Sequence, residues 1–193
     1  VIRDGKVFFV EIKQPKQKSE EWYKLRNELL TASNIWKLFA SEAQCNSLIY
    51  EKCSYKSSNM SSDYINVHST LHCGNTYEPL SAMLYEKIMD TKIEEFGCII
   101  HPQYPFIGAS PDGVITDPDS IRFGRMIEIK NIVNRDITGI PKEEYWIQMQ
   151  IQMETCDLDD CDFVETRFKE YASEEEFYES DLMHDTRGVI LYF

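Results

Sequence analysis

The sequence predicts an α/β domain with a mixed central β-sheet flanked by α-helices. Short apolar segments suited to strands alternate along the chain with longer segments whose apolar residues recur at helical spacing. The chain has 193 residues, of which 42% are hydrophobic and 12% aromatic, and this is enough to bury a core. We therefore expect residues 1–193 to form a single domain, with a polar insertion around residues 53–70.

The charge and the apolar pattern limit the classes of function. The formal net charge is −13, which argues against an ordinary nucleic-acid-binding surface, because contacts to phosphates usually require a basic surface. A protein that encloses its substrate can still place Lys and Arg along an inner channel. No apolar run reaches the roughly 20 residues of a membrane-spanning helix, and no leader peptide is evident, so we expect an intracellular protein without a membrane partner.

The first elements are expected to be a strand and a helix. Residues 7–12 form a short apolar run suited to a strand. Ser19 has the composition of an N-cap, and Trp22, Leu25 and Leu29 follow at helical spacing as a buried stripe.

A second helix is expected to begin at the capping cluster of residues 31–34 and to run to Phe39. A helix N-terminus that carries a hydroxyl, here Ser33, can bind an anion, and Arg26, one turn earlier, could add a bidentate phosphate contact. Arg26 is also compatible with an ordinary surface salt bridge.

Two more helices are expected before the central motif. One lies near residues 47–52, and the other opens at Gly74-Asn75-Thr76-Tyr77-Glu78-Pro79 and continues with an apolar stripe. Glu78 then falls in the first turn, where the helix dipole favours an acid. The apolar segment at residues 96–101 is expected to be a strand.

The segment from Ile107 to Lys130 places charged residues where a fold normally needs apolar ones. Ser110-Pro111-Asp112-Gly113 has the composition of a turn, with strand residues on both sides. In Met126-Ile127-Glu128-Ile129-Lys130, the isoleucines face one side of a strand and the charged pair faces the other. A hairpin-like pairing would bring Asp112 beside Glu128 and Lys130.

Two carboxylates at one place repel each other and are stabilised by a cation. Mg²⁺ prefers such oxygens, and a nearby lysine can position or deprotonate water or offset charge on a phosphate. The alternative is a solvated strand face. A second E-x-K, Val10-Glu11-Ile12-Lys13, lacks the Ser-Pro-Asp-Gly turn, and we interpret it as an ordinary strand.

The last part of the chain predicts one helix and two strands. Pro141 marks a helix start, and residues 143–156 follow, with Tyr145, Gln148, Met149 and Gln152 on one face. Residues 162–168 and 188–193 are expected to be strands.

Pro111-Asp112 … Glu128-Ile129-Lys130 resembles the signature of the PD-(D/E)xK nuclease superfamily. Glu21-Trp22 … Arg26 … Leu30-Thr31-Ala32-Ser33 resembles the opening of its lambda-exonuclease-like branch, the YqaJ-type viral recombinases and alkaline exonucleases. The resembling pieces occur in family order over most of residues 21–168. The resemblance implies a restriction-endonuclease-like core.

The same resemblance implies roles for particular residues. Arg26 and Ser33 match residues that bind the 5′-phosphate of a DNA end, and Ser110 would add a further hydroxyl to that pocket. Residues 74–79 match a G-x-x-x-E-P element, which makes Glu78 a third acid that binds the metal or holds metal-bound water.

The catalytic centre is implied in the same way. Asp112 and Glu128 would bind Mg²⁺, for which Mn²⁺ could substitute, with help from Glu78 and the carbonyl of Ile129. Lys130 would orient or activate water. Gln148 rather than Gln150 matches the glutamine beside the catalytic lysine, and Tyr145 could support the same pocket.

The resulting expectation is a metal-dependent DNA exonuclease that acts 5′-to-3′ on double-stranded ends in recombination or genome processing. Two alternatives are an endonuclease or nickase of the same superfamily, acting on DNA or RNA, and an inactive nucleic-acid-binding module. The resemblance also implies a homo-oligomer, a trimer in some members, a single-strand annealing partner, and location in the cytoplasm or nucleus of an infected cell if the source is viral.

Overall fold

The computed structural model describes residues 2–3, 6–7, 13–54 and 70–179. The helices are α1 (Glu20–Glu28), α2 (Ala32–Ile35), the 3₁₀ helix η2 (Trp36–Leu38), α3 (Glu42–Cys53), α4 (Thr70–Met89), α5 (Glu143–Cys156) and α6 (Glu174–Glu179). The strands are β1 (Ile2–Arg3), β2 (Lys6–Val7), β3 (Leu30–Thr31), β4 (Ile99–Ile100), β5 (Ile107–Ala109), β6 (Gly113–Val114), β7 (Met126–Asn131) and β8 (Cys161–Thr166). No helix within these ranges is long and apolar enough to cross a membrane.

The central sheet has two three-stranded parts, and both are mixed. In the order β3-β5-β4, β5 pairs parallel to β3 and antiparallel to β4. In the order β6-β7-β8, β7 pairs antiparallel to β6 and parallel to β8. The two parts meet at residues 110–112, where Pro111 has no amide hydrogen to continue a ladder. The expected mixed α/β architecture is confirmed.

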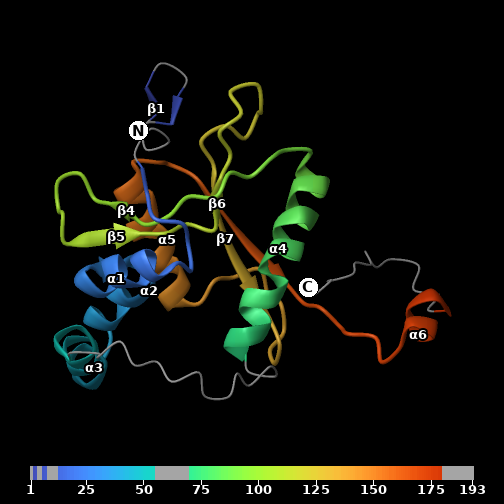
Figure 1. Ribbon diagram of the computed structural model, residues 1–193, viewed down its shortest axis with the longest axis horizontal. Coiled ribbons are helices and arrows are strands. Elements are labelled where there is room, and N and C mark those ends of the chain that lie inside the picture. The colour runs from blue at the N-terminus through green and yellow to red at the C-terminus, as the bar shows by residue number, and fades with distance from the viewer. Residues whose placement is uncertain (1, 4–5, 8–12, 55–69, 180–193) are drawn as a thin grey trace.

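Helices α4 and α5 flank β7 (Figure 1), and each packs on a different set of its side chains. Ile127 and Ile129 pack with Tyr85 of α4, whereas Met126 packs with Cys156 at the end of α5. Because alternate residues of a strand face opposite sides, Glu128 shares the α5 side with Met126.

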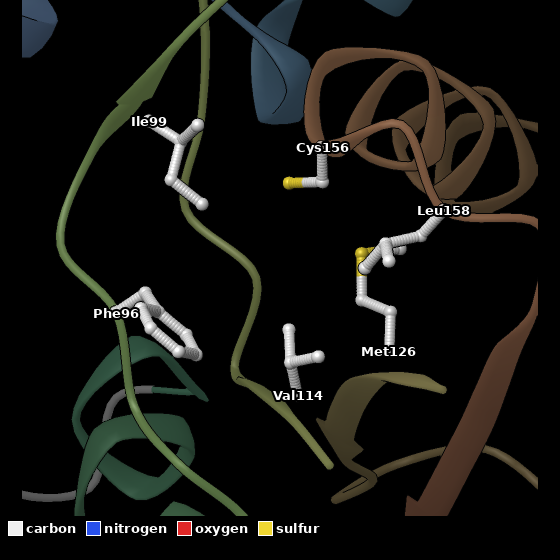
Figure 2. Packing of buried hydrophobic residues seen from close by; sticks show 6 residues of the cluster. All are labelled: Phe96, Ile99, Val114, Met126, Cys156 and Leu158. Carbon is white, nitrogen blue, oxygen red and sulfur yellow. The ribbon is translucent and has the colours of Figure 1, made fainter. Parts of the chain in front are cut away.

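The cluster on the α5 side joins segments that are distant in the sequence. Figure 2 shows the side chains of six residues converging: Phe96, Ile99, Val114, Met126, Cys156 and Leu158. Val114 and Met126 are fully buried. This packing fixes the end of α5 against the start of β7 and so sets the position of the rest of α5 over Glu128.

The expected start of the helix that carries Glu78 is wrong. Helix α4 begins at Thr70 and continues through Pro79, which lies inside it rather than in its first turn. Proline removes one backbone hydrogen bond from a helix interior, but it does not prevent a helix of 20 residues that packs against β7. Glu78 therefore lies well inside the helix, away from the dipole effect of the first turn.

The prediction for the first helix is confirmed, and the expected second helix is present as α2 followed by the 3₁₀ helix η2. The Ser19 hydroxyl accepts a hydrogen bond from the Trp22 amide at 3.2 Å and caps α1. Trp22 and Leu29 are buried together with Cys98, and Leu25 packs beside them. Helix α3 is longer than the expected residues 47–52.

The predictions for the remaining strands have mixed outcomes. Strand β8 covers most of the expected residues 162–168, whereas β4 covers only two residues of the apolar segment from Phe96 to His101. Three expectations lie outside the described residues: the strand at 188–193, most of the strand at 7–12, and residues 55–69 of the insertion. Glu11 of the second E-x-K lies outside them as well. Helix α6 lies apart from the two parts of the central sheet in Figure 1.

Candidate active site

The turn before β6 brings Asp112 to the edge of β7. Gly113 is paired with Ile127, so continued pairing would place Pro111 opposite Ile129. The carboxylate of Asp112 fills that place, because its Oδ2 accepts a hydrogen bond from the Ile129 amide at 2.6 Å. The predicted proximity of Asp112 to the E-x-K strand is therefore present.

The carboxylate of Glu128 is fully buried beneath α5, and both of its oxygens accept hydrogen bonds. Oε1 accepts from the Lys130 ammonium and from Gln148 Nε2, the latter at 2.7 Å. Oε2 accepts from Gln152 Nε2 at 2.8 Å. Charge-assisted hydrogen bonds of this kind are the partners that a buried carboxylate needs.

The charged groups in this cluster alter one another's pKa values. Burial raises the pKa of Asp112 well above its ordinary value, and the nearby carboxylates of Glu128 and Glu78 raise it further. Burial acts to lower the pKa of Lys130, but Glu128 and Asp112 outweigh that effect and raise it. The Lys130 ammonium also lies 5.1 Å from the ring centre of Tyr145, the residue expected to support this pocket.

Glu78 is held by a segment that the sequence reasoning missed. The Lys18 ammonium lies 3.4 Å from both carboxylate oxygens of Glu78. Lys18 has a φ of 65°, an uncommon conformation for a residue other than glycine. Its neighbour Gln17 donates to the carbonyls of Phe96 at 2.7 Å and of Pro111 at 3.0 Å. This tight turn is therefore tied to the residue that precedes Asp112.

The three residues expected to bind a phosphate form one hydrogen-bonded group. Arg26 Nη1 donates to Ser110 Oγ at 3.3 Å, and Nη2 donates to Ser33 Oγ at 2.9 Å. The guanidinium lies 4.3 Å from the Trp22 ring centre, and Trp22 Nε1 donates to Ser110 Oγ at 3.1 Å. The hydroxyl of Thr31 lies 3.3 Å from that of Ser33. Trp22 and Thr31 were expected only as structural residues.

The backbone behind this group is also anchored. Lys52 on α3 donates from Nζ to the carbonyl of Arg26 at 2.8 Å. Burial lowers the pKa of Arg26, but a guanidinium remains protonated at neutral pH. A cationic, hydroxyl-lined site of this kind is suited to an anion such as phosphate.

The donor set suits a small divalent cation, although the described residues contain no group of three His, Cys, Asp or Glu side chains close enough to form a ready metal site. Mg²⁺ needs only one or two carboxylates, with water and substrate oxygens as its other ligands. Asp112 and Glu128 supply the carboxylates. The amides of Met126 and Ile132 donate toward β8, so by alternation the carbonyl of Ile129 faces the side that β6 leaves open.

The structure thus brings together Asp112, Glu128, Lys130 and Gln148 as expected, and Gln150 is exposed. Sequence reasoning did not assign Gln152 to the site. The sequence feature that could have identified Gln152 is its spacing of four residues from Gln148, which places both amides on one face of α5.

Comparisons with known proteins bear on the family and the fold of this chain. A family model of the YqaJ-like viral recombinase domain matches residues 21–159. The crystal structure of an alkaline exonuclease, LHK-Exo, from Laribacter hongkongensis has a TM-score of 0.62 and 29% identity, covering 77% of this chain and 74% of that one. The structure of LHK-Exo in complex with dAMP has a TM-score of 0.60 and 28% identity, covering 76% of this chain and 73% of that one.

The uncharacterized protein R354 of Acanthamoeba polyphaga mimivirus is 32% identical over 180 residues, which is 86% of this chain and 32% of the viral protein. The chain therefore spans about one third of the length of this relative. The family model covers most of the chain, and the fold matches that of an alkaline exonuclease, as the motifs predicted. The chain belongs to the family of YqaJ-like viral recombinase domains.

Proposed function

We propose that this domain is a divalent-metal-dependent exonuclease that digests double-stranded DNA ends in the 5′-to-3′ direction. One observation carries the proposal. Ser110, which accepts hydrogen bonds from Arg26 and Trp22, is two residues from Asp112, which is bonded to the backbone of the E-x-K strand. We call Arg26, Ser33 and Ser110 the anion-binding group, and Asp112 and Glu128 the carboxylate cluster. One turn, residues 110–112, therefore contributes to both.

The anion-binding group favours a terminal phosphate. A terminal phosphate monoester carries a charge near −2 at neutral pH, whereas an internal phosphodiester carries −1. Arg26 offers two nitrogens, and Ser33 and Ser110 offer hydroxyls, so the group supplies several donors at one place. A 5′-phosphate held there would place a nearby phosphodiester at the carboxylates.

Asp112, Glu128 and the carbonyl of Ile129 would hold the metal ion, which we propose to be Mg²⁺ with Mn²⁺ as a substitute. A bound ion of this type supplies Lewis-acid stabilisation of phosphate oxygens and lowers the pKa of bound water. Glu78 would hold metal-bound water rather than bind the metal directly, because in this structure it pairs with Lys18.

Lys130 is the proposed positioning group for the attacking water. Its ammonium is protonated and can donate a hydrogen bond either to water or to a phosphate oxygen as negative charge develops there. Gln148 keeps the Glu128 carboxylate in place beside it. The Tyr145 ring lies beside the lysine, where it would favour the charged ammonium through a cation–π contact.

The relatives support an exonuclease and a viral setting. LHK-Exo is an alkaline exonuclease of similar fold, and R354 is a mimivirus protein. By this similarity, we propose that the domain processes DNA ends for recombination in an infected cell.

The experiment compares a linear duplex carrying 5′-phosphates with a closed circular plasmid, each in Mg²⁺ or EDTA, using wild type and Lys130→Ala. Metal-dependent loss of the linear DNA alone, absent in the variant, is the expected result. Cutting of the circle would show an endonuclease instead. Cleavage of neither substrate, with DNA binding retained, would show a binding module.

A further inference from the structure

Gln152 is a buried polar residue that the proposed mechanism does not use. Its side chain is 1% exposed, in the third turn of α5. Its Nε2 donates to Glu128 Oε2 at 2.8 Å and lies 3.5 Å from the carbonyl oxygen of Ser110. It therefore touches both the carboxylate cluster and the anion-binding group.

The orientation of this amide follows from its partners. A carboxylate and a carbonyl are both acceptors, so the nitrogen must face them and the oxygen must point away. Oε1 of Gln152 is buried and has no hydrogen-bond partner within the described ranges. Burial of an unpaired polar atom is unfavourable, so this cost has to be offset by the hydrogen bonds that Nε2 donates. Packing alone therefore does not account for a glutamine at this position.

Gln148 provides the contrast. It donates to the other oxygen of Glu128, at 2.7 Å, whereas among the described residues the hydrogen bond from α5 to Ser110 comes from Gln152. Ser110 in turn accepts hydrogen bonds from Trp22 and Arg26 through its hydroxyl. Gln152 is therefore the side chain of α5 that holds the two groups together.

We propose that Gln152 is a positioning residue that fixes Glu128 and the Ser110 turn in one arrangement, so that metal binding and recognition of the 5′-phosphate depend on the same buried amide. The inference rests on the proposed function, since it assigns a metal to Glu128 and a phosphate to Ser110. It predicts that a change at Gln152 affects both properties, and that a change at Gln148 affects only metal binding.

The test uses methionine, an unbranched apolar residue of similar length, at three positions of one helix: Gln152→Met, Gln148→Met and Gln150→Met. Mn²⁺ binding to the protein alone is measured by titration calorimetry. Binding of a hairpin duplex with a single 5′-phosphate or 5′-hydroxyl end is measured by fluorescence anisotropy in Ca²⁺, to prevent cleavage.

Gln152→Met should bind Mn²⁺ about 10- to 100-fold more weakly, the usual effect of removing a partner of a metal ligand. It should also lose most of its preference for the phosphorylated end. Gln148→Met should weaken Mn²⁺ binding but keep the preference for phosphate. Gln150→Met, at an exposed position, should match wild type in both measurements.

A folded Gln152→Met protein that binds Mn²⁺ and prefers the phosphorylated end as wild type does would overturn the inference. If it does not fold, Gln152→Asn replaces it, because asparagine keeps the amide but is one methylene too short to reach both partners. A wild-type protein that neither binds Mn²⁺ nor prefers a 5′-phosphate would instead refute the proposed function, so the two failures are distinguishable.

Discussion

Arg26→Lys is the substitution that tests the anion-binding group most directly. It keeps the positive charge but replaces two separate nitrogens with one. In the structure Nη1 of Arg26 donates a hydrogen bond to Ser110 and Nη2 donates one to Ser33. The planar guanidinium also lies over the Trp22 ring. A single ammonium cannot maintain both bonds together with the stacking contact.

The expected effect can be worked out from these contacts. A hydrogen bond involving a charged group contributes about 1.5–3 kcal/mol. Loss of one such bond to the bound phosphate corresponds to about a 10- to 100-fold decrease in affinity, because 1.4 kcal/mol is a factor of ten. The loss should apply to a phosphorylated end and should largely spare a hydroxyl end.

The assay is kcat/KM on internally labelled duplexes that differ only in a 5′-phosphate or a 5′-hydroxyl. Arg26→Lys should reduce the ratio of the two values about 10- to 100-fold. The matched control is Arg122→Lys. Arg122 precedes the start of β7 and pairs with Asp162, whereas Lys130 lies near the other end of that strand. An unchanged ratio in Arg26→Lys, or an equal loss on both substrates, would refute the assignment of Arg26 to the terminal phosphate.

Three further predictions test other parts of the molecule. Lys130→Ala should lower the cleavage rate by about 100-fold or more while duplex binding in Ca²⁺ is retained; an equal loss of binding would count against a role in positioning water. Met126→Ala, at a fully buried site, should lower the free energy of unfolding in urea by about 2–5 kcal/mol, whereas Met83→Ala, at a residue 63% exposed, should change it little. Burial and the hydrogen bond to Asp162 raise the pKa of Tyr85 from 10.0 to about 12, so its stabilisation is complete below pH 10 and is lost as the pH rises toward 12. Between these values the stability of wild type should fall more steeply than that of Tyr85→Phe, and parallel curves would contradict the shift.

The site was predictable where its chemistry depends on local patterns. The alternation in residues 126–130 and the turn before them placed Asp112, Glu128 and Lys130 together, and the structure has them in contact or close. The spacing of Trp22, Leu25 and Leu29 predicted the buried face of α1 for the same reason. These predictions needed only the periodicities of a strand and a helix.

Predictions at element boundaries were less accurate. The capping composition at residues 74–79 suggested a helix start, but α4 begins at Thr70, because tertiary packing on β7 outweighs the cost of Pro79 inside the helix. Likewise, no local sequence pattern predicted that Lys18 would adopt a positive φ and contact Glu78, which is 60 residues away.

The sequence by itself determined the α/β class, the family resemblance and the residue types of the proposed catalytic and anion-binding groups, because these follow from short-range spacing. Only the tertiary structure decided which buried side chains connect the groups. The contacts of Gln152 with Glu128 and Ser110, and of Trp22 with Ser110, join residues 24 to 88 positions apart. Such contacts depend on how α1 and α5 pack against the two parts of the sheet, and helical or strand periodicity carries no information about that packing.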